Sequence, residues 1–418
     1  MRNRIVAIVL FAIALPLFHA SAQQRTVDEV KKSIGDLSAN QKTYQTALKK
    51  ITPALTHPAT KDKAETWWVA GRTHFALYDK YRQSKSVGNT VDAKDMGHSI
   101  VDGYECSTRA LRLDTVWKKN KDGIVKVNKH GVKMFKVKYS KEILNRLYGY
   151  VIDYSMAGAN LYRVKDYEYA FKAWDIYHQL VTSDTAKRKK RADPDSIIGM
   201  MRFYQGLAAL KLKHDTVAHQ LFVDARQWGY KKKVVFDNDL NVLVEMRDTA
   251  EMVKLANEAY SLYGKEDMRY MRILINDCVS KKNYHKAEML LDRAIMRDSV
   301  NSEYFGLKGN IVEYQMGYTY ARAYYARAVE IKPDFAAAQY DLGRCYYLEA
   351  LDLMKANPKR STQNFFQEVA PLLEKAATHL EKAHSMMPSD MSAINMLRNI
   401  YYKLGEGDKL DQIERSVK

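Results

Sequence analysis

"YARAYYARAVEIKPDF", residues 320–335, places Ala321 and Ala328 seven residues apart, with Tyr325 between them and Pro333 near the end. Seven residues make two turns of an α-helix, so both alanines lie on one face with the ring beside them. Two small residues flanking one ring let a second helix approach closely, and the proline ends the helix. The stretch therefore predicts the second helix of a closely packed helix pair.

The same pattern recurs along the chain, and between residues 199 and 336 the repeats begin 34 or 35 residues apart. Ala287 stands 34 residues before Ala321 and is followed at the same offsets by Leu291 and Ala294. Further copies are Ala170, Trp174 and Tyr177; Ala218, Phe222 and Ala225; and Ala376, Leu380 and Ala383. Numbered on this pattern, repeats begin near residues 64, 151, 199, 233, 268, 302, 336 and 391. A fixed period of this length indicates a repeat array.

The repeat unit itself has a recognisable signature. Its first half reads aromatic-x-x-Leu-Gly-x-x-Tyr, with Leu-Gly-x-x-Tyr present at 342–346, and its second half reads Ala-x-x-x-aromatic-x-x-Ala, as at 321–328. This signature resembles the tetratricopeptide repeat (TPR). The resemblance implies an all-α, TPR-type α-solenoid, a superhelix of antiparallel helix pairs. It also implies that the first helix of each pair, helix A, lines a concave groove. The unit at 233–267 keeps the length but few signature residues.

The chain divides into segments around this array. Residues 1–22 have a basic start, an apolar run of fourteen residues and a small-x-small site at Ala20–Ala22. This pattern predicts a signal peptide cleaved after Ala22, with an uncleaved anchor as the alternative. We expect capping helices at 23–63, a first repeat with an insertion at 64–117, a basic β-hairpin at 118–141, and the main array at 142–418, with insertions at 183–196 and 351–371 and a C-terminal cap.

Two basic segments interrupt the helical pattern. "GIVKVNKHGVKMFKVKYS", 123–140, alternates apolar and basic residues around Asn128–Gly131, which predicts a β-hairpin with lysines on one face. Such a face could rest on an anionic surface or protect a strand edge from association, and both interpretations stay open. "KRKKR", 187–191, is expected in a solvated loop. The predicted basic surface is Lys126, Lys133, Lys136, Lys138, Lys187, Arg188, Lys189, Lys190 and Arg191.

Charge and motif content limit the classes of function. The formal net charge of +18 falls to +16 when the signal peptide is removed, so an exported chain would favour anionic lipid headgroups, acidic glycans or acidic proteins over nucleic acid. Three cysteines cannot form a disulfide framework, and buried free thiols are expected. Sequence motifs for nucleophilic, metal-dependent or phosphate chemistry are missing, so we expect neither enzymatic activity nor a cofactor or metal.

The resemblance implies that positions 2, 5, 9, 12 and 13 of each repeat face the groove. The predicted groove residues are Trp68, Arg72, Tyr162, Arg269, Arg272, Asn276, Asn310, Tyr340, Arg344 and Asn399. Rings, arginines and amides are enriched at binding hot spots. Some TPR proteins hold a terminal carboxylate with a five-residue clamp. Here Leu307, Ala337 and Asp341 occupy three of its places, so that clamp is not expected.

These observations predict an exported protein–protein interaction scaffold that binds a peptide or protein in the groove. Signal peptide, repeat array and insertions together resemble cell-envelope TPR proteins of Bacteroidota-type bacteria, which implies a periplasmic or envelope-associated location. The alternative is a binder of an anionic envelope polymer, either an acidic glycan or a lipopolysaccharide or phospholipid headgroup, through the hairpin and the 183–196 loop. A glycan-binding lipoprotein is a third reading, weakened because Gln23 offers no thiol for lipid attachment.

Overall fold

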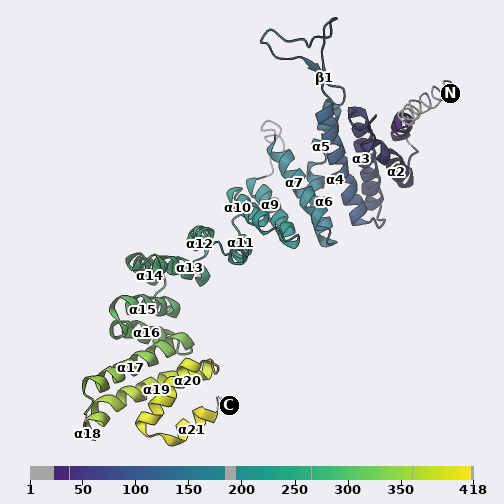
Figure 1. The fold of residues 1–418 in the computed structure, drawn as a ribbon. Coiled ribbons are helices and arrows are strands. Elements are labelled where there is room, and N and C mark those ends of the chain that lie inside the picture. The colour runs from purple at the N-terminus through teal and green to yellow at the C-terminus, as the bar shows by residue number, and fades with distance from the viewer. Residues whose placement is uncertain (1–22, 37, 184–193, 265, 360, 416–418) are drawn as a thin grey trace, which may run out of the picture. The chain divides into compact units, whose positions relative to one another are not determined.

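The computed structural model describes residues 23–36, 38–183, 194–264, 266–359 and 361–415. In this part the chain is all-α and built from antiparallel helix pairs, apart from one two-stranded sheet (Figure 1). It forms two compact units, 1–248 and 249–418, and the boundary falls inside the 233–267 repeat that lacks signature residues. The predicted signal peptide and the 187–191 basic run lie outside the described residues.

The first unit contains the capping pair and the early repeats. Residues 23–34 form a helix that precedes α2. The labelled helices are α2 (Gln41–Thr56), α3 (Ala64–Ser86), α4 (Ala93–Leu113), α5 (Ser140–Gly149), α6 (Val151–Arg163), α7 (Tyr167–Thr182), α9 (Asp195–Lys211), α10 (Asp215–Gln227) and α11 (Lys233–Met246).

The second unit continues the array to the C-terminal cap. Its helices are α12 (Thr249–Tyr263), α13 (Met268–Ser280), α14 (Tyr284–Arg297), α15 (Ser302–Met316), α16 (Tyr318–Ile331), α17 (Ala336–Ala356), α18 (Thr362–Asn364), a π-helix (Phe365–Val369), α19 (Ala370–Met386), α20 (Met391–Leu404) and α21 (Gly407–Arg415). Seven of the eight predicted repeat starts coincide with the first residue of a helix A, and the eighth, predicted near 199, begins at 195.

The repeat signature works through close contact between a glycine and a ring. A Cβ atom added to Gly309 in α15 would lie 2.5 Å from Cε1 of Tyr325 in α16. Gly206 and Gly158 stand in the same relation to Phe222 and Trp174, each at 2.6 Å. These distances are too short for any side chain larger than hydrogen, so the glycine of helix A makes room for the ring of helix B. This contact explains why the pattern recurs.

The insertions predicted in the first repeat and the 336 repeat are occupied mainly by longer helices. α3 and α4 are 23 and 21 residues long and only residues 87–92 separate them. In the later repeat, α17 is 21 residues long, and α18 and the π-helix run directly into α19. The extra residues keep the helical spacing of buried side chains, for example Tyr78 and Tyr81 in α3, so burial extends the helices instead of leaving loops.

The segment between α4 and α5 contains the sheet. β1 (Val116–Trp117) pairs antiparallel with β2 (Phe135–Lys136). The predicted turn at Asn128–Gly131 is present, but the structure adds a second turn of the same kind at Asn120–Gly123. The backbones of Lys118, Lys126 and Met134, eight residues apart, close a ring of three hydrogen bonds of 2.7–2.8 Å. The insertion therefore contains the predicted antiparallel strand pair and carries a second turn within it.

The structure confirms the expected buried free thiols. Cys106, Cys278 and Cys345 are buried and unpaired, and burial raises the pKa of Cys106 and of Cys345 to about 12. Across the described ranges, His, Cys, Asp and Glu side chains nowhere gather in threes suited to a metal ion. None of the helices described is long and apolar enough to cross a membrane.

Candidate functional site

Three successive A helices of the second unit line a pocket of about 240 Å³. α13 contributes Arg272 and Asn276, and α15 contributes Asn310, so three predicted groove residues meet in one place. The remaining lining residues are Glu303, Gly306, Leu307, Phe335, Ala337, Ala338 and Asp341. The pocket thus has an apolar floor and a polar rim, the arrangement expected of a site that fixes the orientation of a ligand.

Arg272 forms the charged side of the rim. Its Nη2 atom lies 2.8 Å from Oε2 of Glu303, and the two side chains are 54% and 34% exposed. Ion pairs this accessible contribute roughly 0–1 kcal/mol. A ligand carboxylate could therefore replace Glu303 at little cost.

Two asparagines form the amide side of the rim. Asn276 and Asn310 occupy the same position in successive repeats, and both are exposed. Each amide offers two donors and one acceptor, the groups that a peptide backbone requires. The Tyr325 hydroxyl lies 2.7 Å from Oδ1 of Asn310 and 2.8 Å from Oε2 of Glu313. The buried ring of the repeat signature therefore also positions a rim amide.

The floor of the pocket is made by small and aromatic side chains. A Cβ atom on Gly306 would lie 3.1 Å from the ring of Phe335. The absence of a side chain at Gly306 therefore leaves space above the Phe335 ring. Leu307, Ala337 and Ala338 complete the floor. The floor offers space for a small apolar side chain. Sequence reasoning missed Phe335 and Glu303 as lining residues, although Glu303 occupies position 2 of its repeat.

Arg344, a predicted groove residue, is engaged by neighbouring carboxylates. Its Nη1 and Nη2 atoms lie 2.6 and 2.7 Å from the two carboxylate oxygens of Glu313, and Nη2 lies 3.0 Å from Oδ1 of Asp341. The hydrogen bonds to Glu313 hold the pKa of Arg344 above its ordinary value. Burial raises the pKa of Glu313, but the hydrogen bonds from Arg344 and Tyr325 outweigh it, so the pKa is lowered overall. For Asp341, burial dominates and raises the pKa.

The predicted residues of the first unit lie in packed surroundings. Trp68 is 7% exposed and stacks on Tyr139 with ring centroids 4.6 Å apart. The Arg72 guanidinium lies 5.1 Å from the Trp68 ring, and its Nε atom lies 3.3 Å from Oε1 of Glu142. Both side chains therefore contact α5 or the residue before it. Tyr162 is half-buried, with its ring centroid 6.0 Å from that of Trp174.

The other predicted groove residues of the second unit lie apart from this pocket. Arg269 pairs with Asp267 at 2.6 Å. Tyr340 is half-buried against the C-terminal core. Asn399 lines a separate, more open hollow of about 440 Å³ beside Arg398 and Tyr402. Their role as partner contacts stays a prediction.

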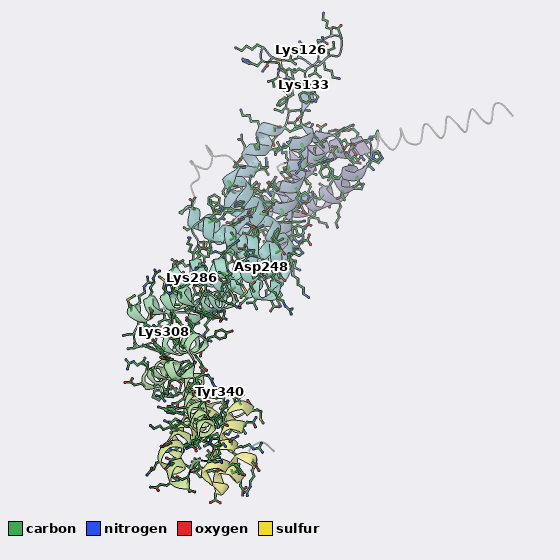
Figure 2. All side chains as sticks on the ribbon, turned by 60° about the vertical axis from the view of Figure 1, so that its left-hand side comes forward. Lys126, Lys133, Asp248, Lys286, Lys308 and Tyr340 are labelled. Atoms are coloured by element: carbon green, nitrogen blue, oxygen red, sulfur yellow. The ribbon has the colours of Figure 1, made fainter. Side chains whose placement is uncertain are left out.

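The basic residues predicted on the insertion are exposed. Lys126, Lys133, Lys136 and Lys138 all lie on the surface, and Figure 2 labels Lys126 and Lys133 on the segment that projects away from the helices. Sequence reasoning treated this segment mainly as a charge pattern. It did not foresee that its apolar side chains would be exposed together with the lysines.

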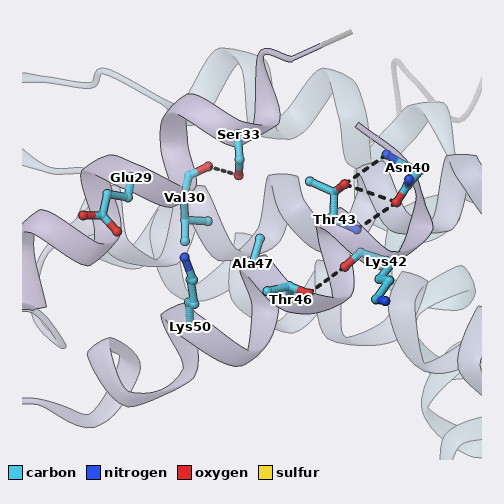
Figure 3. Close-up of a pocket in the computed structure, with 9 residues that line it drawn as sticks. All are labelled: Glu29, Val30, Ser33, Asn40, Lys42, Thr43, Thr46, Ala47 and Lys50. Atoms are coloured by element: carbon cyan, nitrogen blue, oxygen red, sulfur yellow. Dashed lines mark hydrogen bonds between the residues drawn. The ribbon is translucent and has the colours of Figure 1, made fainter. Parts of the chain in front are cut away.

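Two hollows of the first unit are weaker candidates. Figure 3 shows a pocket of about 350 Å³ at the capping helices, where Ser33 and Thr46 donate to backbone carbonyls of their own helices at 2.7 and 2.8 Å. Its hydroxyl groups are therefore occupied locally. A hollow of about 530 Å³ beside α3, α4 and α6 includes Arg82, which pairs with Asp153 at 3.3 Å.

Comparison with known proteins finds no matching family model and no matching curated protein. Solved structures do match. The C-terminal part of a TPR repeat-containing protein from Cytophaga hutchinsonii is 14% identical, with 62% of this chain and 94% of that one covered and a TM-score of 0.39. YrrB, described as a TPR protein with an unusual peptide-binding site, is 18% identical, with 62% and 96% covered and a TM-score of 0.25.

A third similar structure is the TPR2AB domain of yeast Sti1 in complex with pHSP90. It is 14% identical, with 80% of this chain and 97% of that one covered and a TM-score of 0.26. With TM-scores this low, the three likenesses carry no argument about what this chain binds. The helix-pair fold rests on the chain's own glycine–ring contacts.

Proposed function

We propose that this chain is a non-enzymatic scaffold that binds an extended segment of a partner protein on the A helices α13, α15 and α17. The observation that carries the proposal is the meeting of Arg272, Asn276 and Asn310 around one pocket with an apolar floor. Exposed amides at one position of successive repeats are suited to an extended backbone, because that backbone presents donors and acceptors at regular intervals.

The dimensions of the pocket agree with such a ligand. An extended chain advances about 3.3 Å per residue, so a short segment could reach from Asn276 on α13 to Asn310 on α15, which line the same pocket. An acidic group of the ligand would meet Arg272, and a small apolar side chain would rest on Leu307 and Ala337.

The proposed cellular context is the cell envelope. The pattern of residues 1–22 supports export, and the strongly basic charge supports acidic partners there. We propose a periplasmic or envelope-associated location, with a partner protein in the same compartment.

A random peptide library tests the proposal while the natural partner is still unidentified. Peptides displayed on phage would be selected on the full chain, and the affinity of the enriched peptides measured by fluorescence polarisation. Asn276→Ala/Asn310→Ala should weaken binding by about tenfold or more, since each lost hydrogen bond contributes about 1 kcal/mol. Arg272→Glu should remove the preference for acidic peptides.

Asn257→Ala is the matched control. Asn257 is an exposed asparagine on α12 whose Nδ2 atom donates to the carbonyl of Val253 in its own helix at 2.8 Å. This variant should bind the selected peptides as the wild type does. Peptides that bind the double asparagine variant with undiminished affinity would show that this pocket is not the binding site.

A further inference from the structure

The insertion at 116–138 exposes seven large apolar side chains, and two of them, Trp117 and Phe135, pack edge to face with ring centroids 6.0 Å apart. Trp117, Phe135 and Ile124 are 44%, 52% and 66% exposed. The further exposed apolar residues are Val116, Val127, Val132 and Val137. Contiguous exposed apolar surface on a folded protein commonly marks an interaction site with a protein or a membrane.

The same segment is strongly cationic. It contains eight lysines and one acidic residue, Asp122, so its formal charge is +7 with histidine neutral. Lys126 and Lys133 lie on the part that projects beyond α4 and α5 (Figures 1 and 2). Lysines interleaved with aliphatic and aromatic side chains are typical of elements that lie at the lipid–water interface.

The backbone of the insertion is also suited to a medium with little water. The ring of hydrogen bonds among Lys118, Lys126 and Met134 satisfies backbone groups internally. The side chains of Asn120 and Asn128 accept two backbone hydrogen bonds each within their own turns. Because these polar groups are already paired, moving them into the headgroup region leaves few unsatisfied.

The insertion is firmly attached at its base. The Asp114 carboxylate, 2% exposed at the end of α4, accepts hydrogen bonds from the backbone nitrogens of Lys138, Tyr139 and Ser140 at 2.7–3.0 Å. The returning strand is therefore tied to the start of α5.

We propose that residues 116–138 form a membrane-docking element that binds the surface of an anionic lipid bilayer. The lysines contact headgroup phosphates, and Trp117, Phe135 and Ile124 enter the acyl boundary. A soluble polyanion would engage the lysines alone and leave the seven apolar side chains in water. Protection of a strand edge is a weaker explanation, since the strands are two residues long and need little protection.

The test uses the full chain with vesicles of phosphatidylcholine, with and without phosphatidylglycerol, and with soluble heparin as a separate polyanion. Sedimentation with the vesicles gives affinity, and quenching of tryptophan by brominated acyl chains gives insertion. Residues 1–22 contain no tryptophan, so quenching does not report on them. Trp117 is the most exposed candidate reporter, and its contribution is the quenching lost in Trp117→Ser.

Two variants separate the apolar and ionic contributions. Trp117→Ser/Phe135→Ser should lower affinity for phosphatidylglycerol vesicles about tenfold or more and leave heparin binding unchanged. Lys126→Gln/Lys133→Gln/Lys136→Gln should lower both by about tenfold or more. The control, Lys49→Gln/Lys61→Gln/Lys211→Gln, removes three exposed lysines elsewhere in the same unit and should leave vesicle quenching unchanged.

Each outcome decides the proposal. Unchanged vesicle binding by Trp117→Ser/Phe135→Ser would overturn it and leave a general polyanion site. If the lysine control lost as much vesicle affinity as the insertion-lysine variant, only the net charge of the protein would matter. That result would also overturn the proposal. Circular dichroism would confirm that the helices remain intact, as expected for changes outside the helical core.

Discussion

Arg344 of α17 donates two hydrogen bonds to Glu313 of α15, from Nη1 to Oε1 at 2.6 Å and from Nη2 to Oε2 at 2.7 Å. This bidentate pair joins two successive A helices. The two side chains are only 22% and 21% exposed. A two-point contact of this kind fixes direction as well as distance. It therefore sets how one repeat stacks on the next beside the candidate peptide pocket.

The first prediction follows from this pair. Arg344→Met should lower the free energy of unfolding of the second unit by roughly 1–3 kcal/mol, because Glu313 and Asp341 are left half-buried without the guanidinium that pairs with them. Arg344→Met/Glu313→Gln should recover part of the loss. Chemical denaturation of the four proteins of this cycle measures the coupling. A loss in the double variant equal to the sum of the two single-variant losses would contradict a direct interaction.

Tyr325 links the repeat signature to the pocket. Tyr325→Phe keeps the ring that fills the space at Gly309 but removes the hydroxyl 2.7 Å from Asn310. We expect a loss in affinity of several-fold for the selected peptides, since the net contribution of one hydrogen bond is about 1 kcal/mol. The comparison is a peptide titration beside a thermal melt. A fall in stability without a fall in affinity would assign the hydroxyl a structural role alone.

The glycine–ring contact predicts that a glycine-to-alanine change in helix A lowers stability, although the same change elsewhere in a helix normally raises it. Alanine normally stabilises a helix, but a Cβ atom on Gly309 would meet Tyr325 at 2.5 Å. Gly309→Ala should therefore cost about 1–3 kcal/mol through overpacking. Gly407→Ala, at a position with no atom within 4 Å, should be neutral or slightly stabilising. Thermal melts of both proteins check the contrast.

His74 in α3 predicts acid sensitivity of the first unit. Burial lowers the pKa of His74 to about 4, from an ordinary value of 6.5. The unfolded chain therefore binds a proton between these values and the folded chain does not, so stability falls as the pH drops from 6.5 towards 4. The full effect of such a shift is on the order of 3 kcal/mol.

A variant that cannot titrate isolates this contribution. His74→Gln should show a smaller fall in melting temperature between pH 6.5 and pH 4 than the wild type. His130→Gln removes an exposed histidine and should follow the wild-type curve. Parallel curves for the wild type and His74→Gln would mean that other groups cause the acid sensitivity.

Asp114 predicts a local effect at the base of the insertion. Burial raises the pKa of Asp114, but hydrogen bonds from residues 138–140 outweigh it and hold the pKa below its ordinary value. Asp114→Ala would leave these backbone groups without their acceptor, at a cost of roughly 1–3 kcal/mol. Hydrogen exchange followed by mass spectrometry should show faster exchange at residues 138–140, with helices distant from α5 unchanged. Unaltered exchange at residues 138–140 would contradict a stabilising role of the Asp114 hydrogen bonds.

The repeat unit could be predicted from the sequence, because its packing depends on residue size at fixed helical spacing. Gly309, Ala321 and Tyr325 can be read as a helix contact without knowing any distant residue. The turn at Asn128–Gly131 could be predicted for the same reason, since its backbone geometry is local. Arg272, Asn276 and Asn310 came together as the repeat register implies.

Features that join residues far apart in the chain emerged only from the folded structure. Glu142 is 70 residues from Arg72, so no local sequence pattern could predict that Trp68 and Arg72 pack against the α5 region. Likewise, the inserted residues became longer helices because burial against neighbours, and not propensity, sets where a helix ends. The pattern of side-chain volumes along one helix can be read from neighbouring residues in the sequence. The partner of a charged side chain or a ring depends on which distant residues the packed fold brings next to it.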